Sequence, residues 1–432
     1  MQTSAEVPAH TVIRPERIAR RLRYKESREI NMSTWIRRAA ALGAAVLIQL
    51  YGAAAYYAWQ LPDSYYVETG NQLQMDTALH IAAVPTAKEV QAAGHAPDAE
   101  TAALRLFGVI PIKDVEIQEI DTPLLVPCGQ PFGIQLRMGG AMVVGLDEVE
   151  TDSGARCPAQ EAGIQTGDLI QSIDGTAIDS NQSLSSAIAA SAGAAVSVTL
   201  RRGEETRTCT LTPAYAADDH CYEAGIWVRD SSAGIGTMTF YDPDSGSFGG
   251  LGHPICDTDT GDILPLDSGE AGPVEIFQVT KGTAGNPGML QGRFTEDAPL
   301  GKLLCNNRCG IFGTLYHAPT DAAPVPMGLK QDIATGPAQI LCTVSGSEPE
   351  AYDIVIEEID YSGTDSTRNM TICVTDPALL EITGGIVQGM SGSPILQDGK
   401  LIGAVTHVFV DDPTRGYGIF CENMVRYGLC GS

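Results

Sequence analysis

The sequence has 432 residues, which allows two or three folded units and excludes a small disulfide-stapled scaffold. Hydrophobic residues make up 44% of the chain and charged residues 19%, so wholesale disorder and a multi-pass membrane protein are excluded. The net charge is −26, and we therefore expect no nucleic-acid partner. The 47 glycines and the aromatic content of only 6% indicate many tight turns and hence short strands.

Basic residues are concentrated at the N-terminus. Residues 1–38 hold nine arginines and lysines against four glutamates, and we interpret them as a cytoplasmic basic segment. The next 21 residues, 39–59, have one strongly polar side chain, Gln49, and a helix of that length covers the hydrocarbon core of a bilayer. This pattern predicts a single transmembrane anchor with the rest of the chain outside the cytoplasm. A cleaved signal peptide is the alternative.

Residues 60–104 contain scattered proline and glycine without a sustained period, which predicts a stalk. Residues 105–124 alternate apolar and polar side chains and predict a lead-in strand. The eleven cysteines are an odd number and form no CxxC pair, and Cys305 and Cys309 lack a second ligand pair. We therefore expect neither a metal nor another cofactor.

Residues 125–212 follow the order strand, strand, helix, strand, strand, helix, strand, strand. An Asp174-Gly175 hairpin turn precedes the second helix, for which Ser183 is the expected N-cap. This order, with the stretch EAGIQTGDLIQSIDG, resembles a PDZ domain. In PDZ domains a loop of backbone N–H groups captures a peptide carboxylate, and the next strand edge pairs with the peptide. The residues that match this loop are Pro131, Phe132, Gly133 and Ile134.

Residues 223–432 hold short strand-like runs separated by turns, which predicts a barrel or sandwich. Near the end stands GGIVQGMSGSPILQDGKLIGAVTH. A serine flanked by glycines on a tight turn can expose its hydroxyl, and the N–H groups of Gly389 and Ser391 would form an oxyanion hole. A hairpin follows Ser391 where an α/β-hydrolase would have a helix, so we expect a mainly β, chymotrypsin-like double β-barrel.

A serine nucleophile needs a general base, and His253 in FGGLGHPICDTDTG is the preferred candidate. Its place ahead of the serine follows the chymotrypsin order of histidine, aspartate and serine. His407, on the strand after Ser391, is the second candidate. For the acid that orients the base we select Asp376 in CVTDPALL. The spacing in the sequence does not exclude Asp257, Asp259 or Asp360 as the orienting acid.

The blocks SFGGLGHPI, TDPALLEITGGIVQGMSGSPI and VTHVFVDDPTRGYGIF resemble the stage IV sporulation protein B family of serine peptidases. The resemblance implies a membrane anchor, a PDZ domain and a peptidase domain, with His253, Asp376 and Ser391 as the catalytic triad. It also implies export into the space between the mother-cell and forespore membranes. There the family cleaves the inhibitory subunit of a membrane-embedded sigma-factor-processing protease complex, and cleaves itself near the N-terminus.

Two other classes of protein stay open. One is an envelope quality-control protease, although these usually place the PDZ domain after the catalytic domain. The other is a non-catalytic anchored PDZ adaptor with a dead peptidase fold, against which all three candidate catalytic residues argue.

Overall fold

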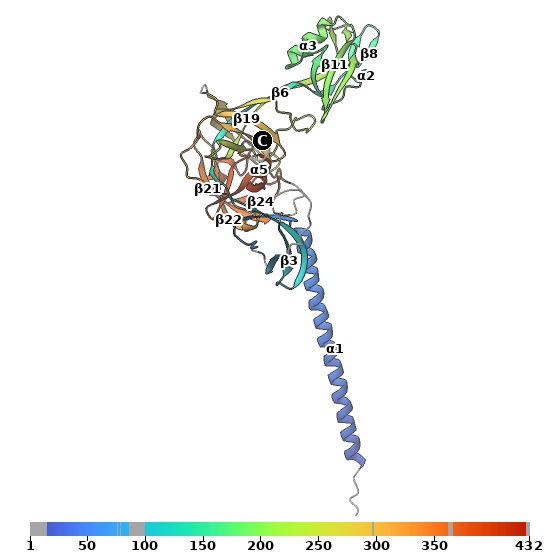
Figure 1. Ribbon diagram of the computed structural model, residues 1–432, viewed down its shortest axis with the longest axis vertical. Coiled ribbons are helices and arrows are strands. Elements are labelled where there is room, and N and C mark those ends of the chain that lie inside the picture. Colours follow the sequence, from blue (N-terminus) through green and yellow to red (C-terminus); the bar gives the residue numbers. More distant parts are fainter. Residues whose placement is uncertain are drawn as a thin grey trace, which may run out of the picture.

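The computed structural model describes residues 15–75, 77, 79–85, 100–295, 298–361 and 366–428, with side chains from residue 35 on. It is mainly β, as expected, and one helix projects far from the body (Figure 1). That helix is α1 (Pro15–Gln60), and its apolar part, Trp35–Gln60, has 26 residues and a mean hydropathy of 1.5. Its length and apolarity suffice for one membrane crossing. The apolar part is slightly longer than the predicted span of 39–59.

The residues predicted to form a stalk and a lead-in strand form a small sheet instead. The structure describes this segment except for residues 76, 78 and 86–99. Its strands are β1 (Ser64–Glu68), β2 (Ile81–Pro85), β3 (Glu100–Leu106) and β4 (Ile110–Ile120), in the order β1-β4-β3-β2. Tyr65, Leu104 and Val115 are buried in its core. The stalk prediction is wrong because β1 pairs in parallel with β4, about 50 residues away, and so distant a pairing leaves no local pattern.

The peptidase body contains two barrels, which confirms the predicted double-barrel fold. The pairings of the first close a ring in the order β6-β17-β19-β20-β16-β15 and back to β6. The second is a closed barrel, β22-β23-β24-β27-β26-β25. The bounds of the first six are β6 (Pro131–Leu146), β15 (Ile226–Tyr241), β16 (Ser247–Gly250), β17 (Ser268–Thr280), β19 (Gly301–Asn307) and β20 (Gly310–Leu315).

The strands of the second barrel are β22 (Gly336–Cys342), β23 (Glu350–Ile359), β24 (Met370–Val374), β25 (Pro394–Gln397), β26 (Lys400–Val408) and β27 (Arg415–Phe420). Beside the barrels lie β5 (Leu124–Pro127), β18 (Met289–Phe294), β21 (Val325–Pro326), the short 3₁₀-helix η1 (Lys330–Asp332), α4 (Pro377–Thr383) and α5 (Cys421–Gly428). The Asp398-Gly399 turn between β25 and β26 has positive φ at both residues, as a tight hairpin requires.

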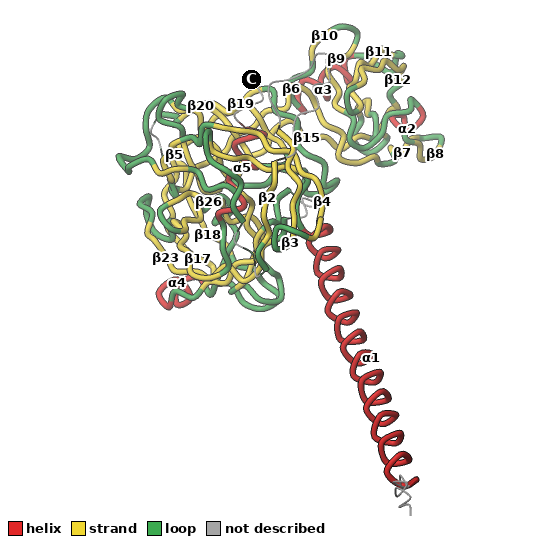
Figure 2. Tube along the Cα trace, turned by 60° about the horizontal axis from the view of Figure 1, so that its bottom comes forward, coloured by secondary structure: helices red, strands yellow, loops and turns green. Residues whose placement is uncertain are grey.

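The PDZ domain is inserted into the first barrel. The strands β6 and β15 pair along their length, from Pro131 opposite Thr237 to Leu146 opposite Ile226, and run out of the barrel into the PDZ domain. Figures 1 and 2 show this domain set apart from the body at the end away from α1. The expected boundaries of 125–212 and 223–432 are therefore corrected: residues 125–137 belong to the two-barrel body, and the start of β15 belongs to the PDZ domain.

From α2 to β12 the inserted domain has the expected order of helices and strands, but the two strands expected at its start are one continuous strand, β6. Its elements are β7 (Val149–Thr151), β8 (Gly154–Arg156), α2 (Pro158–Glu161), β9 (Leu169–Ile173), β10 (Thr176–Ala177), α3 (Asn181–Ala190), β11 (Val196–Arg202), β12 (Glu205–Leu211), β13 (Ala214–Ala216) and β14 (Cys221–Glu223). The predicted Asp174-Gly175 turn joins β9 to β10 with φ of 47° and 77°. The N-cap of α3 is Ser180 and not Ser183, because the two serines form a reciprocal capping box.

Candidate active site

Ser391 lies on a tight turn between α4 and β25. The turn needs glycine on both sides, because Gly389 has a φ of 99° and Gly392 a φ of 96°. A Cβ at Gly392 would lie only 2.0 Å from the carbonyl oxygen of Thr237. The serine is thus held against β15 with its side chain partly exposed, which is the geometry that a nucleophilic hydroxyl requires.

Two buried threonines of β15 hold the carbonyl groups of this turn. Thr237 Oγ1 donates to Gly389 O at 2.8 Å, and the N–H of Thr237 donates to Ser391 O at 3.0 Å. Thr239 Oγ1 donates to Gly392 O at 2.7 Å. Both threonines are at most 2% exposed, so these hydrogen bonds are shielded from water. The sequence carries no signal that would single out either threonine.

The carbonyl groups preceding the two expected oxyanion donors are also held. Gln388 O accepts from the N–H of Leu290 at 2.8 Å, and Met390 O accepts from the N–H of Ser393 at 2.9 Å. In a trans peptide the N–H points opposite to the carbonyl, so the N–H groups of Gly389 and Ser391 point away from these partners. Among the described residues, neither N–H donates to a protein acceptor. Both donors are available to a developing oxyanion.

His253 lies beside this turn. Gly252 is so close to β26 that a Cβ there would lie 2.9 Å from Thr406 Cγ2, and Ser391 Oγ donates to the carbonyl oxygen of the same Thr406 at 2.8 Å. The rings of His253 and His407 are 5.0 Å apart. Both candidate bases therefore adjoin residues at the turn: His253 follows Gly252, and His407 follows Thr406, whose carbonyl accepts from Ser391. Leu251, two residues before His253, has a φ of 66°, which is a strained backbone conformation for a residue with a bulky side chain.

The protonation state of His253 suits a general base. Its Nδ1 lies 2.9 Å from the carbonyl oxygen of Pro254, which can only accept, so Nδ1 carries the proton and Nε2 is the basic nitrogen. Burial lowers the pKa of His253 below its ordinary value, although the hydrogen bond to Pro254 partly opposes this. The imidazole is therefore neutral at pH 7. In this conformation the Ser391 hydroxyl faces Thr406 O and not His253.

Asp376 does not meet His253 in this structure. It is the N-cap of α4: Oδ1 accepts from the N–H groups of Ala378 and Leu379 at 2.9 and 3.1 Å, and Oδ2 lies 3.4 Å from the N–H of Asp353. An aspartate before a proline at the first helical position is the residue pattern typical of a helix start, and α4 begins in this way.

The other aspartates considered as orienting acids also have different positions. Asp257 is buried and pairs with Arg229 at 2.7 Å, and Asp259 contacts the same guanidinium at 3.1 Å. Asp360 follows β23 and donates its N–H to Asn369 O. In the described part of the chain no carboxylate is hydrogen bonded to His253. The hydrogen-bond acceptor that orients His253 here is the carbonyl of Pro254.

The residues predicted to capture a peptide carboxylate are in the peptidase barrel. Phe132, Gly133 and Ile134 pair with β15 on one side and with β17 on the other, so no edge is open to a peptide. Phe132 is fully buried, and Ile134 is 4% exposed. The prediction is wrong because these residues continue a strand whose alternate side chains, Phe132 to Met138, all face the core.

The comparisons with known proteins agree with this architecture. Residues 220–425 match the SpoIVB peptidase S55 family, and residues 151–202 match the PDZ domain family. Over these two segments the chain is similar to SpoIVB-like serine peptidases that carry a PDZ domain. No curated protein matches the sequence significantly.

Solved structures similar to parts of this peptidase share little sequence with it. The PDZ domain of the SdrC-like protein from Listeria monocytogenes is 24% identical, covering 21% of this chain and 87% of its own, with a TM-score of 0.17. The active form of the Rv3671c protease from M. tuberculosis is 16% identical, covering 45% of this chain and 72% of its own, with a TM-score of 0.29.

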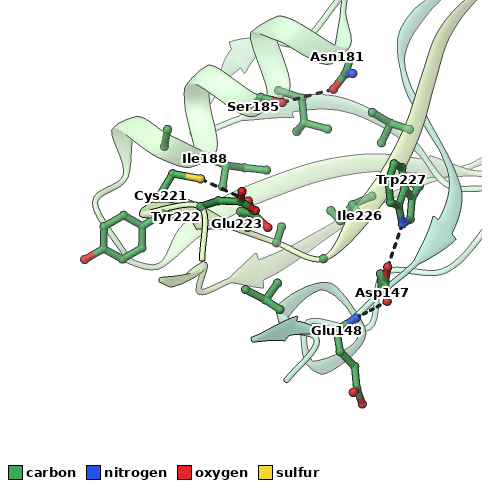
Figure 3. Close-up of a pocket in the computed structure, with 17 residues that line it drawn as sticks. Asp147, Glu148, Asn181, Ser185, Ile188, Cys221, Tyr222, Glu223, Ile226 and Trp227 are labelled. Carbon is green, nitrogen blue, oxygen red and sulfur yellow. Dashed lines mark hydrogen bonds between the residues drawn. The ribbon is translucent and has the colours of Figure 1, made fainter. Parts of the chain in front are cut away.

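The groove of the PDZ domain lies between α3 and the start of β15 (Figure 3). It has a volume of about 550 Å³. The loop Ala224-Gly225 precedes it, and Gly225 has a φ of 67°. The sequence analysis missed this loop, although Ala224-Gly225-Ile226 repeats the apolar-Gly-Ile pattern of Phe132-Gly133-Ile134. The same pattern recurs elsewhere in the chain, for example at Ala162-Gly163-Ile164 and Ala233-Gly234-Ile235, so only the pairing of the strands shows which copy borders the groove.

Four buried cysteines are poor candidates for a nucleophile. All ten cysteines that the structure describes are free, and Cys430 lies outside the described residues. Burial raises the pKa of Cys128, Cys342 and Cys421, and it raises that of Cys309 to about 11. These thiols are protonated at neutral pH and are poor nucleophiles.

Proposed function

We propose that this chain is a membrane-anchored signalling endopeptidase of a sporulating bacterium. Its substrate would be the inhibitory subunit of the membrane-embedded complex that processes a late sigma-factor precursor, and it would also cleave itself near the N-terminus. The peptidase and PDZ domains would lie in the space between the mother-cell and forespore membranes. The peptidase family of residues 220–425, the PDZ domain and the long apolar part of α1 support this proposal.

The proposed reaction uses Ser391 and His253. The hydroxyl of Ser391 rotates from Thr406 O to His253 Nε2 and attacks the scissile carbonyl, while its proton passes to Nε2. The negative charge that develops on the substrate oxygen is stabilised by the N–H groups of Gly389 and Ser391. His253 then returns the proton to the leaving amine. A water molecule, activated in the same way, releases the acyl group and regenerates the enzyme.

One observation carries this function: the turn of Ser391 has its carbonyl groups held by the protein and two N–H groups left for an anion. Two backbone N–H groups that donate to no described protein acceptor, beside a partly exposed serine hydroxyl, are what an oxyanion hole requires. A fluorophosphonate probe should therefore label the wild-type protein on Ser391. Ser393→Ala is the matched control, since Ser393 is fully buried two residues away.

The expected result is labelling of the wild type and of Ser393→Ala, and none of Ser391→Ala. Equal labelling of Ser391→Ala would refute the nucleophile, and no labelling of any form would favour the anchored adaptor. Coexpression with the proposed inhibitory subunit tests the substrate. Cleavage of that subunit by the wild type but not by Ser391→Ala supports the signalling role, whereas degradation of any unfolded protein without cleavage of the subunit indicates a quality-control protease.

A further inference from the structure

The PDZ groove has an apolar floor and an acidic rim. Leu184 and Ile188 present the buried face of α3 to the groove, and Ile226 lies opposite them on β15. Four carboxylates stand among the residues that line it, namely Asp147, Glu148, Asp219 and Glu223, and no lysine or arginine does. Figure 3 labels Asp147, Glu148 and Glu223.

In the described part of the chain, two of these carboxylates have no positively charged partner. The side chains of Glu148 and Asp219 are exposed and make no ion pair there. Asp147 accepts from the Trp227 indole N–H at 3.3 Å, and Glu223 accepts from the Cys221 thiol at 3.3 Å, and neither donor carries a positive charge. The groove therefore has a negative potential that only a cationic ligand would complement.

The backbone at the groove can take an added strand. Ile226, Trp227 and Val228 pair with β6 on one side, and among the described residues no strand pairs with their other edge, which faces α3. A strand added there would alternate its side chains, one set toward Leu184 and Ile188 and the other toward the rim. Glu223, beside the Ala224-Gly225 loop, would oppose the terminal carboxylate that PDZ domains usually capture.

We propose that this groove recognises a basic peptide segment, in which lysines or arginines alternate with apolar residues, in preference to an acidic segment or a bare C-terminal carboxylate. This proposal rests on one part of the proposed function, namely that the PDZ domain binds a protein partner, and it adds which kind of peptide the groove prefers. Its test measures binding and not cleavage, so it can fail while the peptidase assignment stands.

The probes are two peptides with the same alternate valines and either lysines or glutamates between them, both amidated and labelled with a neutral dye. Full-length Ser391→Ala protein in detergent prevents cleavage while binding is followed by fluorescence anisotropy. We expect the lysine peptide to bind about tenfold more tightly or better, and the difference to shrink in about 0.5 M salt. Equal binding of both peptides would overturn the proposal.

Variants identify the groove as the site. Glu148→Gln with Asp219→Asn should remove most of the preference for lysine, since neither side chain supports the fold by a described contact. Asp152→Asn with Glu204→Gln is the matched control: it removes the same charge from exposed positions of the same domain outside the groove and should keep the preference. A preference that survives the groove variant, or tight binding of the glutamate peptide only when its C-terminus is a free acid, would overturn the proposal.

Discussion

Thr237 Oγ1 lies 2.8 Å from the carbonyl oxygen of Gly389 and so connects the long strand β15 to the nucleophile turn. Ten residues earlier on the same strand, Trp227 lines the PDZ groove. The edge that borders the PDZ groove and the residue that holds the Ser391 turn are therefore parts of one strand. No flexible linker separates recognition from chemistry along this path.

Replacing Thr237 by valine should damage catalysis without unfolding the barrel. Valine keeps the shape of the buried side chain but removes the hydroxyl, so the carbonyl of Gly389 loses its donor and the peptide that follows can rotate. We expect kcat to fall by about tenfold or more, approaching the loss seen when an oxyanion donor is removed, with little change in KM. Steady-state kinetics on an activated ester measure this. Thr314→Val on β20 is the control, and an unchanged kcat in a folded Thr237→Val protein would contradict the role.

The pH dependence should reflect the neutral form of His253. Because burial lowers its pKa, the activity should rise with pH along a limb whose midpoint lies below about 6.5, the ordinary value for histidine. By linkage, the stability that comes from burying the neutral ring is present above that ordinary value and is lost as the pH falls through the lowered pKa. A pH profile of kcat/KM measures the first effect, and thermal unfolding between pH 5 and 7 measures the second.

Variants of the two histidines show which of them causes the rise of activity with pH. His253→Gln should abolish turnover at every pH, whereas His407→Gln should retain it and keep the limb. If His407→Gln is inactive and His253→Gln is not, the second candidate is the base.

Substitutions of Asp376 distinguish a helix cap from a triad member. Asparagine caps a helix about as well as aspartate, so Asp376→Asn should be stable and active within a few-fold, while Asp376→Ala should lose about 1 kcal/mol of unfolding free energy. Denaturant unfolding together with kcat measures both. The family resemblance instead implies that Asp376 orients the base, and a fall in kcat of about 10⁴ in Asp376→Asn would show that this carboxylate reaches His253 during turnover.

Gly133→Glu should lower every activity together, because the new side chain would displace the ring of Phe294 from the outer face of the first barrel. A Cβ at Gly133 would lie 2.0 Å from that ring, on the face of β6 opposite to Phe132 and Ile134. We expect the variant to lose about 1–3 kcal/mol of stability, which is what overpacking costs. Trp227→Ala, in the exposed wall of the groove, should by contrast weaken binding of a protein partner and leave hydrolysis of a small ester nearly unchanged. Thermal melts and parallel ester and protein assays separate the two outcomes.

The sequence by itself determined the features that depend on neighbouring residues. The turn of Ser391 is one, because glycines on both sides of a serine are enough to indicate positive φ and an exposed hydroxyl. The Asp174-Gly175 and Asp398-Gly399 hairpins are others, because only certain residue pairs adopt a two-residue hairpin turn without strain. The apolar run before Gln60 likewise indicates a membrane helix from length and composition alone.

Only the tertiary structure decided which distant strands pair and what each motif contacts. The Phe-Gly-Ile motif at Gly133 and the Ala-Gly-Ile motif at Gly225 are locally alike, yet the first is paired on both sides inside the barrel and the second borders the groove. Asp376 could orient a base or cap a helix, and its position after β24 selects the cap in this structure. Such choices depend on contacts between residues far apart in the chain, whose free energy is gained only when the barrels close, so no local pattern records them.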